Sequence, residues 1–245
     1  NADGKTVMLS DNVNESITIA SSQTVTLNLN GFTLTNTAGK HTITNAGTLT
    51  VEGNGTVDNV SHGKGALVNT GIVTLNGGTF TRSQEKGTAA GANGNSWYVV
   101  DNHGTITVND GVTITNTSGF SSLIRNGNPA GTLNVFGGVF SNDFIVLKND
   151  DNGTITMTGG TVSTTGAGGS ALQNWGQATV SGGTLNAVDS AVAVYALTWD
   201  DAYTSDLTIT GSATLNGDVK VMRDDYETSN NPTVVVAGGM VDGNI

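Results

Sequence analysis

Along the whole chain, apolar residues alternate with small polar ones, and Gly and Asn interrupt the alternation at short intervals. Segments such as 47–51 (GTLTV) and 153–157 (GTITM) place aliphatic residues on one side and Thr on the other. This period of two is that of a strand with one buried face, and no stretch keeps the roughly 3.6-residue period of an amphipathic helix. The pattern therefore predicts an all-β protein built from many short strands.

The alternating segments recur as nine imperfect copies spaced by 22 to 33 residues, and a Gly-Gly pair keeps the same place in many of them. Hairpins would turn every 8–12 residues or so, whereas a solenoid makes each copy one coil stacked on its neighbours. Within a copy we expect three strands: one of the GTLTV type, one after Gly-Gly, and one before an Asn. The central apolar residues of the copies are expected at Leu29, Val51, Leu75, Val108, Val135, Met157, Val180, Ile209 and Val236.

Asparagine marks the end of the predicted third strand in several copies. Asn45, Asn69, Asn102 and Asn174 each precede a Gly by two positions. Asn and Gly both accept the left-handed backbone of a tight corner, which is the role expected for them. Stacked Asn side chains can also form a hydrogen-bonded ladder from coil to coil.

The stretch TVTLNLNGFTLT (24–35) and the recurring GTxTV and GGT segments resemble the right-handed parallel β-helix (pectin-lyase-like) repeat modules of bacterial cell-surface proteins. The resemblance covers nearly the whole chain and implies a right-handed parallel β-helix of about nine to ten coils with three short strands each. Residues 1–245 are then expected to form one β-helix domain, with 1–23 as an N-terminal cap or first coil and a truncated C-terminus. The same fold carries adhesins, phage tailspikes and polysaccharide-degrading enzymes, so function has to come from particular residues.

Composition removes several classes of function. The formal net charge is -11 with only nine Lys and Arg, so the chain is a poor binder of nucleic acid or anionic membranes. No apolar run is long enough to span a bilayer, and no membrane insertion is expected from this segment. The absence of Cys excludes disulfides, thiolate zinc sites and a Cys nucleophile.

The corner between the third and first strands holds the candidate chemistry. It is a compact Asn-Gly turn in early copies and becomes TWDDAYTSD (198–206) and RDDYETSNNP (223–232) in the last two. Aromatic rings stack on sugars, and carboxylates and amides bond to hydroxyls, so this edge is expected to bind a ligand. Earlier copies add Asp101, His103, Arg125, Asp150 and Asp151 to the edge. The expected ligand-binding residues are Trp175, Trp199, Asp200, Asp201, Tyr203, Arg223, Asp224, Asp225 and Tyr226.

Two alternatives at this edge stay open. Asp, Asn, Ser and Tyr are ordinary turn residues near a solenoid end. Clustered carboxylates on loops also suit Ca²⁺, although the spacing matches no standard calcium loop, and no other cofactor is indicated. A separate insertion at 81–97 carries Arg82, Glu85, Lys86 and Trp97, and we expect a tolerated surface loop with Trp97 against the coil wall.

Catalysis and ice binding are weaker alternatives. Glycosidases of the pectin-lyase-like fold are expected to carry Gly-His-Gly and Arg-Ile-Lys-like segments, and neither occurs. An ice-binding face needs Thr-x-Thr on every coil, but Asn134 and Gln177 interrupt it. We therefore expect a non-catalytic, extracellular adhesin-type binding module for a glycan or host surface protein, attached to the cell through other parts of a longer surface protein. The alternative is a polysaccharide-degrading glycosidase or lyase of this fold.

Overall fold

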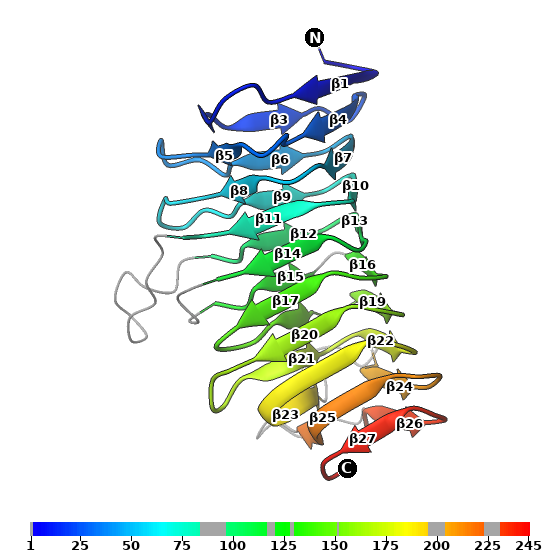
Figure 1. Ribbon diagram of the computed structural model, residues 1–245. Helices are drawn as coiled ribbons and strands as arrows, with labels where there is room; N and C mark the ends of the chain where they lie inside the picture. Colours follow the sequence, from blue (N-terminus) through cyan, green and yellow to red (C-terminus); the bar gives the residue numbers. More distant parts are fainter. Residues whose placement is uncertain are drawn as a thin grey trace.

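The structure is a computed structural model that describes residues 2–83, 97–116, 121–127, 130–150, 152–195, 204–222 and 231–245. These residues form 27 β-strands and no helix. Each strand pairs in parallel with the equivalent strand of the next coil, so the chain is a stacked parallel β-solenoid (Figure 1). The all-β class and the coiled stack predicted from the repeat are confirmed.

Three faces run the length of the solenoid, and a coil is numbered from its strand on the first face. The first face contains β1 (Lys5–Met8), β4 (Thr24–Asn28), β7 (Thr48–Glu52), β10 (Ile72–Leu75), β13 (Thr105–Val108), β16 (Thr132–Val135), β19 (Thr154–Met157), β22 (Gln177–Val180), β24 (Asp206–Ile209) and β26 (Thr233–Val236). The second contains β2 (Val13–Asn14), β5 (Thr33–Thr35), β8 (Thr56–Asp58), β11 (Gly78–Thr81), β14 (Val112–Thr115), β17 (Val139–Asn142), β20 (Thr161–Thr164) and β27 (Met240–Asp242). The third contains β3 (Ile17–Ile19), β6 (Ile43–Asn45), β9 (Leu67–Asn69), β12 (Val100–Asn102), β15 (Ile124–Asn126), β18 (Leu147–Asn149) and β21 (Ser170–Asn174).

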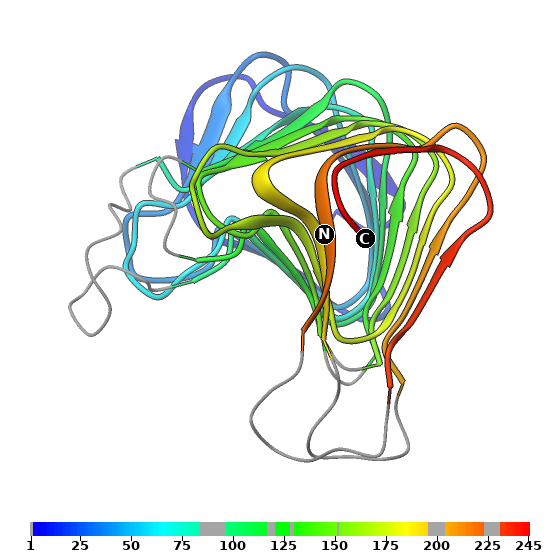
Figure 2. The ribbon, with the colours of Figure 1, turned by 90° about the horizontal axis from the view of Figure 1, so that it is seen from below.

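Near the C-terminus the second and third faces merge. β23 (Thr184–Tyr195) and β25 (Thr214–Met222) each continue from the second face into the third without a break. The solenoid therefore amounts to about eight three-strand coils, close to the nine to ten expected. Seen from below in Figure 2, the chain runs counter-clockwise as it advances toward the viewer, so the coil is right-handed.

Aliphatic side chains stack inside the solenoid in columns that follow the predicted phase. On the first face, Val51 pairs with Leu75 and Leu75 with Val108, and all three are fully buried. Full burial of such a side chain contributes about 1.5–3 kcal/mol. In the first copy, however, the residue opposite Val51 is Leu27, so the predicted Leu29 is wrong by two positions. A period of two cannot distinguish Leu27 from Leu29, because both point inward.

Six buried asparagines form a ladder on the inner side of the third face. In the first five, Nδ2 donates to the Oδ1 of the next Asn along the axis, at 2.7–2.8 Å. The ladder ends against Ile19 at one side and Val194 at the other. The predicted ladder is thus present, and it is longer than expected. Its members are Asn45, Asn69, Asn102, Asn126, Asn149 and Asn174.

The left-handed backbone predicted for these asparagines is wrong. Among the described non-glycine residues only Asn30 and Asn152 have positive φ, so the ladder asparagines are ordinary strand residues. The glycines two positions later are needed for space instead. A Cβ on Gly71 would lie 2.2 Å from the oxygen of Gly47, and one on Gly104 would lie 2.2 Å from the oxygen of Gly71. Small residues at this corner therefore let successive coils approach closely.

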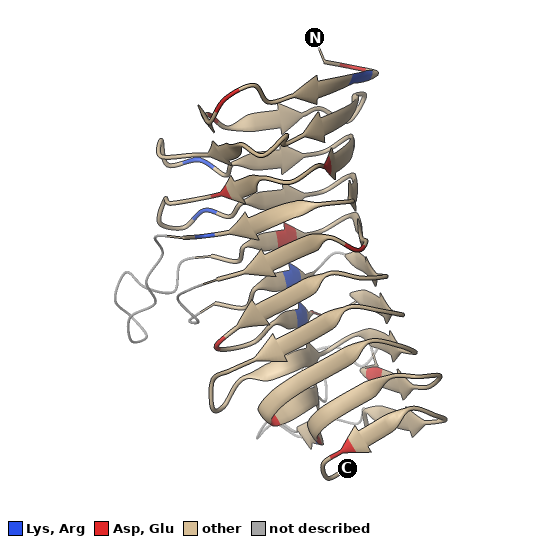
Figure 3. Cartoon of the chain, viewed as in Figure 1, with Lys and Arg blue, Asp and Glu red and all other residues tan. Residues whose placement is uncertain are grey.

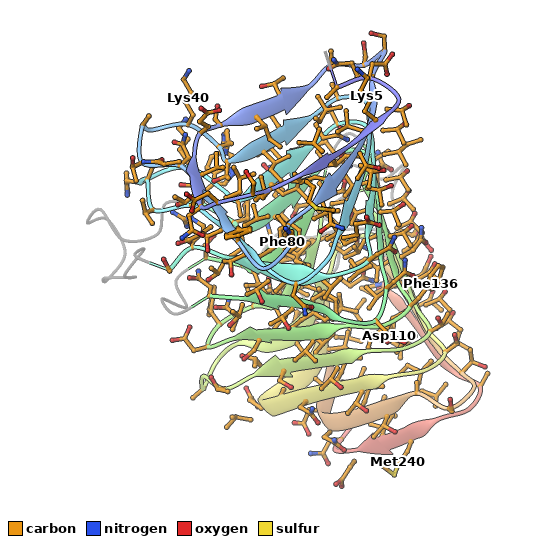
Figure 4. All side chains as sticks on the ribbon, turned by 45° about the horizontal axis from the view of Figure 1, so that its top comes forward. Lys5, Lys40, Phe80, Asp110, Phe136 and Met240 are labelled. Carbon is orange, nitrogen blue, oxygen red and sulfur yellow. The ribbon has the colours of Figure 1, made fainter. Side chains whose placement is uncertain are left out.

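The two ends of the solenoid differ, and Lys5 and Met240 mark them in Figure 4. The N-terminal residues form β1, β2 and β3, which continue all three faces. At this end an apolar cavity of ≈ 430 Å³ opens between Val7, Leu9 and Leu27. Lys5 lies in an inward column, opposite Val25, and charges at such positions discourage strand addition at an open edge.

Candidate functional site

Charged side chains gather on the outer surface of the third face. The outward residues of β12, β15, β18 and β21 are Asp101, Arg125, Lys148 and Gln173, one beside the next in register. Figure 3 shows the charged segments of β12, β15 and β18 one below another. The equivalent outward positions of the first face are mostly Thr, which suits a solvated strand and carries no particular chemistry.

The charges of this surface are paired with one another. Arg125 donates from Nε to Asp150 at 2.7 Å and lies 3.7 Å from Asp101. Lys148 contacts the other oxygen of Asp150 at 2.7 Å, and His103 Nε2 lies 3.1 Å from Asp101. Burial acts to lower the pKa of Arg125, but the hydrogen bond and charge of Asp150 outweigh it, so this pKa is raised. Two cations thus face two carboxylates, and the cluster is close to neutral.

Toward the C-terminus the charged cluster continues into aromatic rings. Lys148 Nζ lies 5.3 Å from the centre of the Trp175 ring. The indole also stacks on the Tyr195 ring, with 4.1 Å between ring centres and 12° between planes. Gln173 donates to the Tyr195 hydroxyl at 3.3 Å. Lys148 and Tyr195 thus both pack against Trp175, whose side chain remains partly exposed.

Toward the N-terminus the cluster continues through a second aromatic group. The guanidinium of Arg125 lies 5.6 Å from the Tyr98 ring centre, a contact worth about 0.5–1 kcal/mol at an exposed site. Trp97 lies 5.9 Å from Tyr98 and 5.6 Å from His41, centre to centre. Gly65 makes room for this segment, because a Cβ there would lie 2.8 Å from the carbonyl oxygen of Tyr98 and 3.1 Å from Trp97 Cδ1. The insertion thus ends with Trp97 against the coil wall, as expected.

Contacts of His41 and Arg82 hold Trp97 and Tyr98 in place. The backbone N–H of Gly65 donates to His41 Nδ1 at 3.0 Å, which requires that nitrogen to be unprotonated. Burial, with the nearby charge of Lys64, lowers the pKa of His41. Arg82 is fully buried and donates to the carbonyl oxygen of Trp97. The neutral imidazole and the buried guanidinium together hold Trp97 and its neighbour in place.

These contacts join into one continuous band, which we call the stripe. It crosses the third face from coil two to coil eight, a distance of six coil steps of ~4.8 Å, or about 29 Å along the axis. Aromatic groups form its two ends and paired charges form its centre. Its residues are His41, Trp97, Tyr98, Arg125, Lys148, Asp150, Trp175 and Tyr195.

The predicted site residues divide into two groups. Trp175 lies in the stripe, and the edge residues Asp101, His103, Arg125 and Asp150 meet as expected from their shared corner. The remainder lie outside the described residues and stay predictions. These are Asp151, Trp199, Asp200, Asp201, Tyr203, Arg223, Asp224, Asp225 and Tyr226.

Sequence reasoning missed His41, Tyr98, Lys148, Gln173 and Tyr195. A signal for two of them was present. The residues directly before and after each ladder Asn point outward, because the Asn points inward and side chains alternate along a strand. Outward neighbours on successive coils could therefore have been paired by aligning the asparagines.

The described part of the chain brings no three His, Asp or Glu side chains together in a way that would hold a metal ion. Within the same ranges no helix has the length and hydropathy needed to cross a membrane. The fold and the stripe define a parallel β-solenoid with one chemically distinct face. Comparisons with protein-family models, curated proteins and solved structures find no match to this chain.

Proposed function

We propose that this solenoid is a non-catalytic, extracellular binding module of the adhesin type, and that the stripe recognises a glycan. The observation that supports the proposal most directly is the composition of the stripe. Aromatic rings at its two ends flank Arg125, Lys148 and Asp150, whereas the outward positions of the first face are mostly Thr. Such rings and planar polar groups suit a ligand that has both hydroxyls and apolar ring faces.

The absence of aliphatic side chains from the stripe favours a glycan over a protein partner. The described large hydrophobic residues that are exposed lie on the other faces or near the two ends, for example Ile72, Phe136 and Val139. Stable protein interfaces need a more apolar centre than the paired charges found here. A host surface protein is therefore the second candidate partner.

A polysaccharide-degrading enzyme is the alternative function. Asp101 and Asp150 lie on either side of Arg125, as two carboxylates of a hydrolase could. Both carboxylates are engaged with the same guanidinium, and Asp150 also contacts Lys148, so both are already occupied by cations of the protein itself. This arrangement favours binding over catalysis.

A glycan array, followed by calorimetry on the polysaccharides that bind, tests the proposal. Binding should fall at least about tenfold for Arg125→Gln and for Trp175→Ala, because a few central residues carry most of an interface's affinity. Phe136→Ala is the matched control, since this ring is 50% exposed on the first face. Unchanged binding in both stripe variants would refute the stripe as the site, and release of reducing sugar would favour the enzyme.

Two further arms address the predictions outside the described residues. Asp200→Asn with Asp225→Asn tests the two C-terminal corner loops, and unaffected binding would remove them from the site. Titration with and without Ca²⁺ tests the calcium prediction. A Ca²⁺-independent affinity would leave the module without a metal requirement.

A further inference from the structure

We infer that the stripe binds a linear polymer that lies along the stripe, obliquely across the third face, with both aromatic ends in contact with the same chain. This inference rests on the proposed function and specifies its ligand class as an extended, neutral glycan. It follows from the layout of the stripe, from its charge balance and from the rigidity of the coils beneath it.

The layout separates two aromatic groups by a polar centre. His41, Trp97 and Tyr98 form the N-terminal group over coils two to four, and Trp175 with Tyr195 forms the C-terminal group over coils seven and eight. Three coil steps, or about 14 Å, separate Tyr98 from Trp175 along the axis. A monosaccharide would touch one group only, whereas an extended oligosaccharide spans the polar centre.

The charge balance of the centre favours a neutral chain. Arg125 and Lys148 both contact Asp150, and Arg125 also lies near Asp101. A uronic acid or sulfated sugar would have to displace one of these carboxylates to bind a cation. It would also approach a chain with a net charge of -11, which repels anions over a distance of about a Debye length.

The Asn ladder holds the coils beneath the stripe at a fixed spacing along the solenoid axis. The Asn ladder joins coils two to seven, and Asn102, Asn126 and Asn149 stand directly beside the outward residues Asp101, Arg125 and Lys148. Buried, hydrogen-bonded amides fix the spacing of the coils. The stripe is therefore formed before the ligand arrives, so binding loses little conformational entropy.

Calorimetry with cello-, xylo- and malto-oligosaccharides, each from the monosaccharide to the octasaccharide, tests the inference. In the series that binds, Kd should fall by about tenfold or more between the disaccharide and the hexasaccharide, because both ends then engage one chain. Tyr98→Ala and Tyr195→Ala should each weaken the hexasaccharide severalfold. At most one of them should affect the disaccharide. Phe136→Ala should affect neither, and circular dichroism would check that each variant is folded.

The outcomes separate this inference from the function on which it rests. A Kd that does not change with chain length, or one aromatic end without effect on the hexasaccharide, would overturn the linear ligand while leaving a glycan-binding module. Tighter binding of oligogalacturonate than of neutral chains would overturn the neutral class. If no glycan of any length binds and an extended peptide does, both the proposed function and the inference fail.

Discussion

The buried Asn ladder allows one prediction to be worked out in detail. In the change Asn126→Ala, the side chain loses hydrogen bonds to Asn149 Oδ1 at 2.8 Å, to Gly131 O at 2.9 Å and to Thr154 O at 3.1 Å. Asn102 loses its acceptor at 2.8 Å. Each intact bond contributes about 0.5–1.5 kcal/mol, and a buried polar atom left unpaired costs about 1–3 kcal/mol. We expect a loss of about 3–5 kcal/mol in the free energy of unfolding.

The chain contains a matched control for burial. Asn109 donates to Asn76 Oδ1 at 2.7 Å in the same coil-to-coil geometry, but this pair lies on the solvent side of the first face. Water can replace the lost partner there, so Asn109→Ala should cost less than about 1 kcal/mol. The two variants remove similar side-chain bonds and differ mainly in solvent access.

Equilibrium urea unfolding, followed by far-ultraviolet circular dichroism, measures both losses. Because each coil contacts only its neighbours, native-state hydrogen exchange should place the Asn126→Ala loss in coils four to six. If Asn126→Ala costs no more than Asn109→Ala, burial is not what makes the ladder stabilising. The physical account of the third face would then be wrong.

Three further predictions follow from single contacts. Gly65→Ala should displace the Trp97–Tyr98 segment, since the added Cβ would lie 2.8 Å from the carbonyl oxygen of Tyr98 and 3.1 Å from the Trp97 ring. A shift of indole fluorescence in a chain that keeps Trp97 as its single Trp would report the displacement, and an unchanged spectrum would contradict the close packing of Trp97 over Gly65. Burial lowers the pKa of His41, so the folded state favours the neutral imidazole. Its contribution to the free energy of unfolding is therefore fully present above about pH 6.5 and is lost as the pH falls through the lowered pKa. His41→Gln should therefore flatten the acid side of the stability curve, and an unchanged slope would rule this out. Gly104→Ala should unfold at lower urea than Gly39→Ala. The first places a Cβ 2.2 Å from a backbone oxygen, whereas the second meets open space and adds only the backbone strain of a φ of +75°. Equal midpoints would show that the coil spacing adapts.

The fold could be predicted from the sequence because its signal repeats. The alternation of apolar residues gave the register of every first-face copy from Val51 to Val236, since each aligned residue does pair with the next. It failed at Leu29, where three successive inward positions, Val25, Leu27 and Leu29, offer equivalent choices. Register in such a segment depends on the turn that follows, which the period does not reveal.

The stripe was harder to predict because its chemistry does not repeat. Asp101, Arg125, Lys148 and Gln173 occupy the same outward position in four coils, yet no two are alike. They lie 23 to 25 residues apart in sequence, so their contacts become visible only once the third-face register is known. Trp175 is one of only three Trp residues and was predicted as a site residue. Lys148, which lies over its ring, was not predicted.

The direction of the strands has a mechanical consequence. Every strand lies across the long axis, so a pull on the two ends would load the bonds of one terminal coil at a time, as in unzipping. Release of a 24-residue coil, such as that from Val51 to Leu75, would add about 80 Å of contour length. Coils beyond Asn174 lack ladder bonds and should yield at lower force than coils two to seven. Under tension the part of the stripe above the ladder would be among the last parts to unravel, so a ligand held there would keep its contacts while the ends extend.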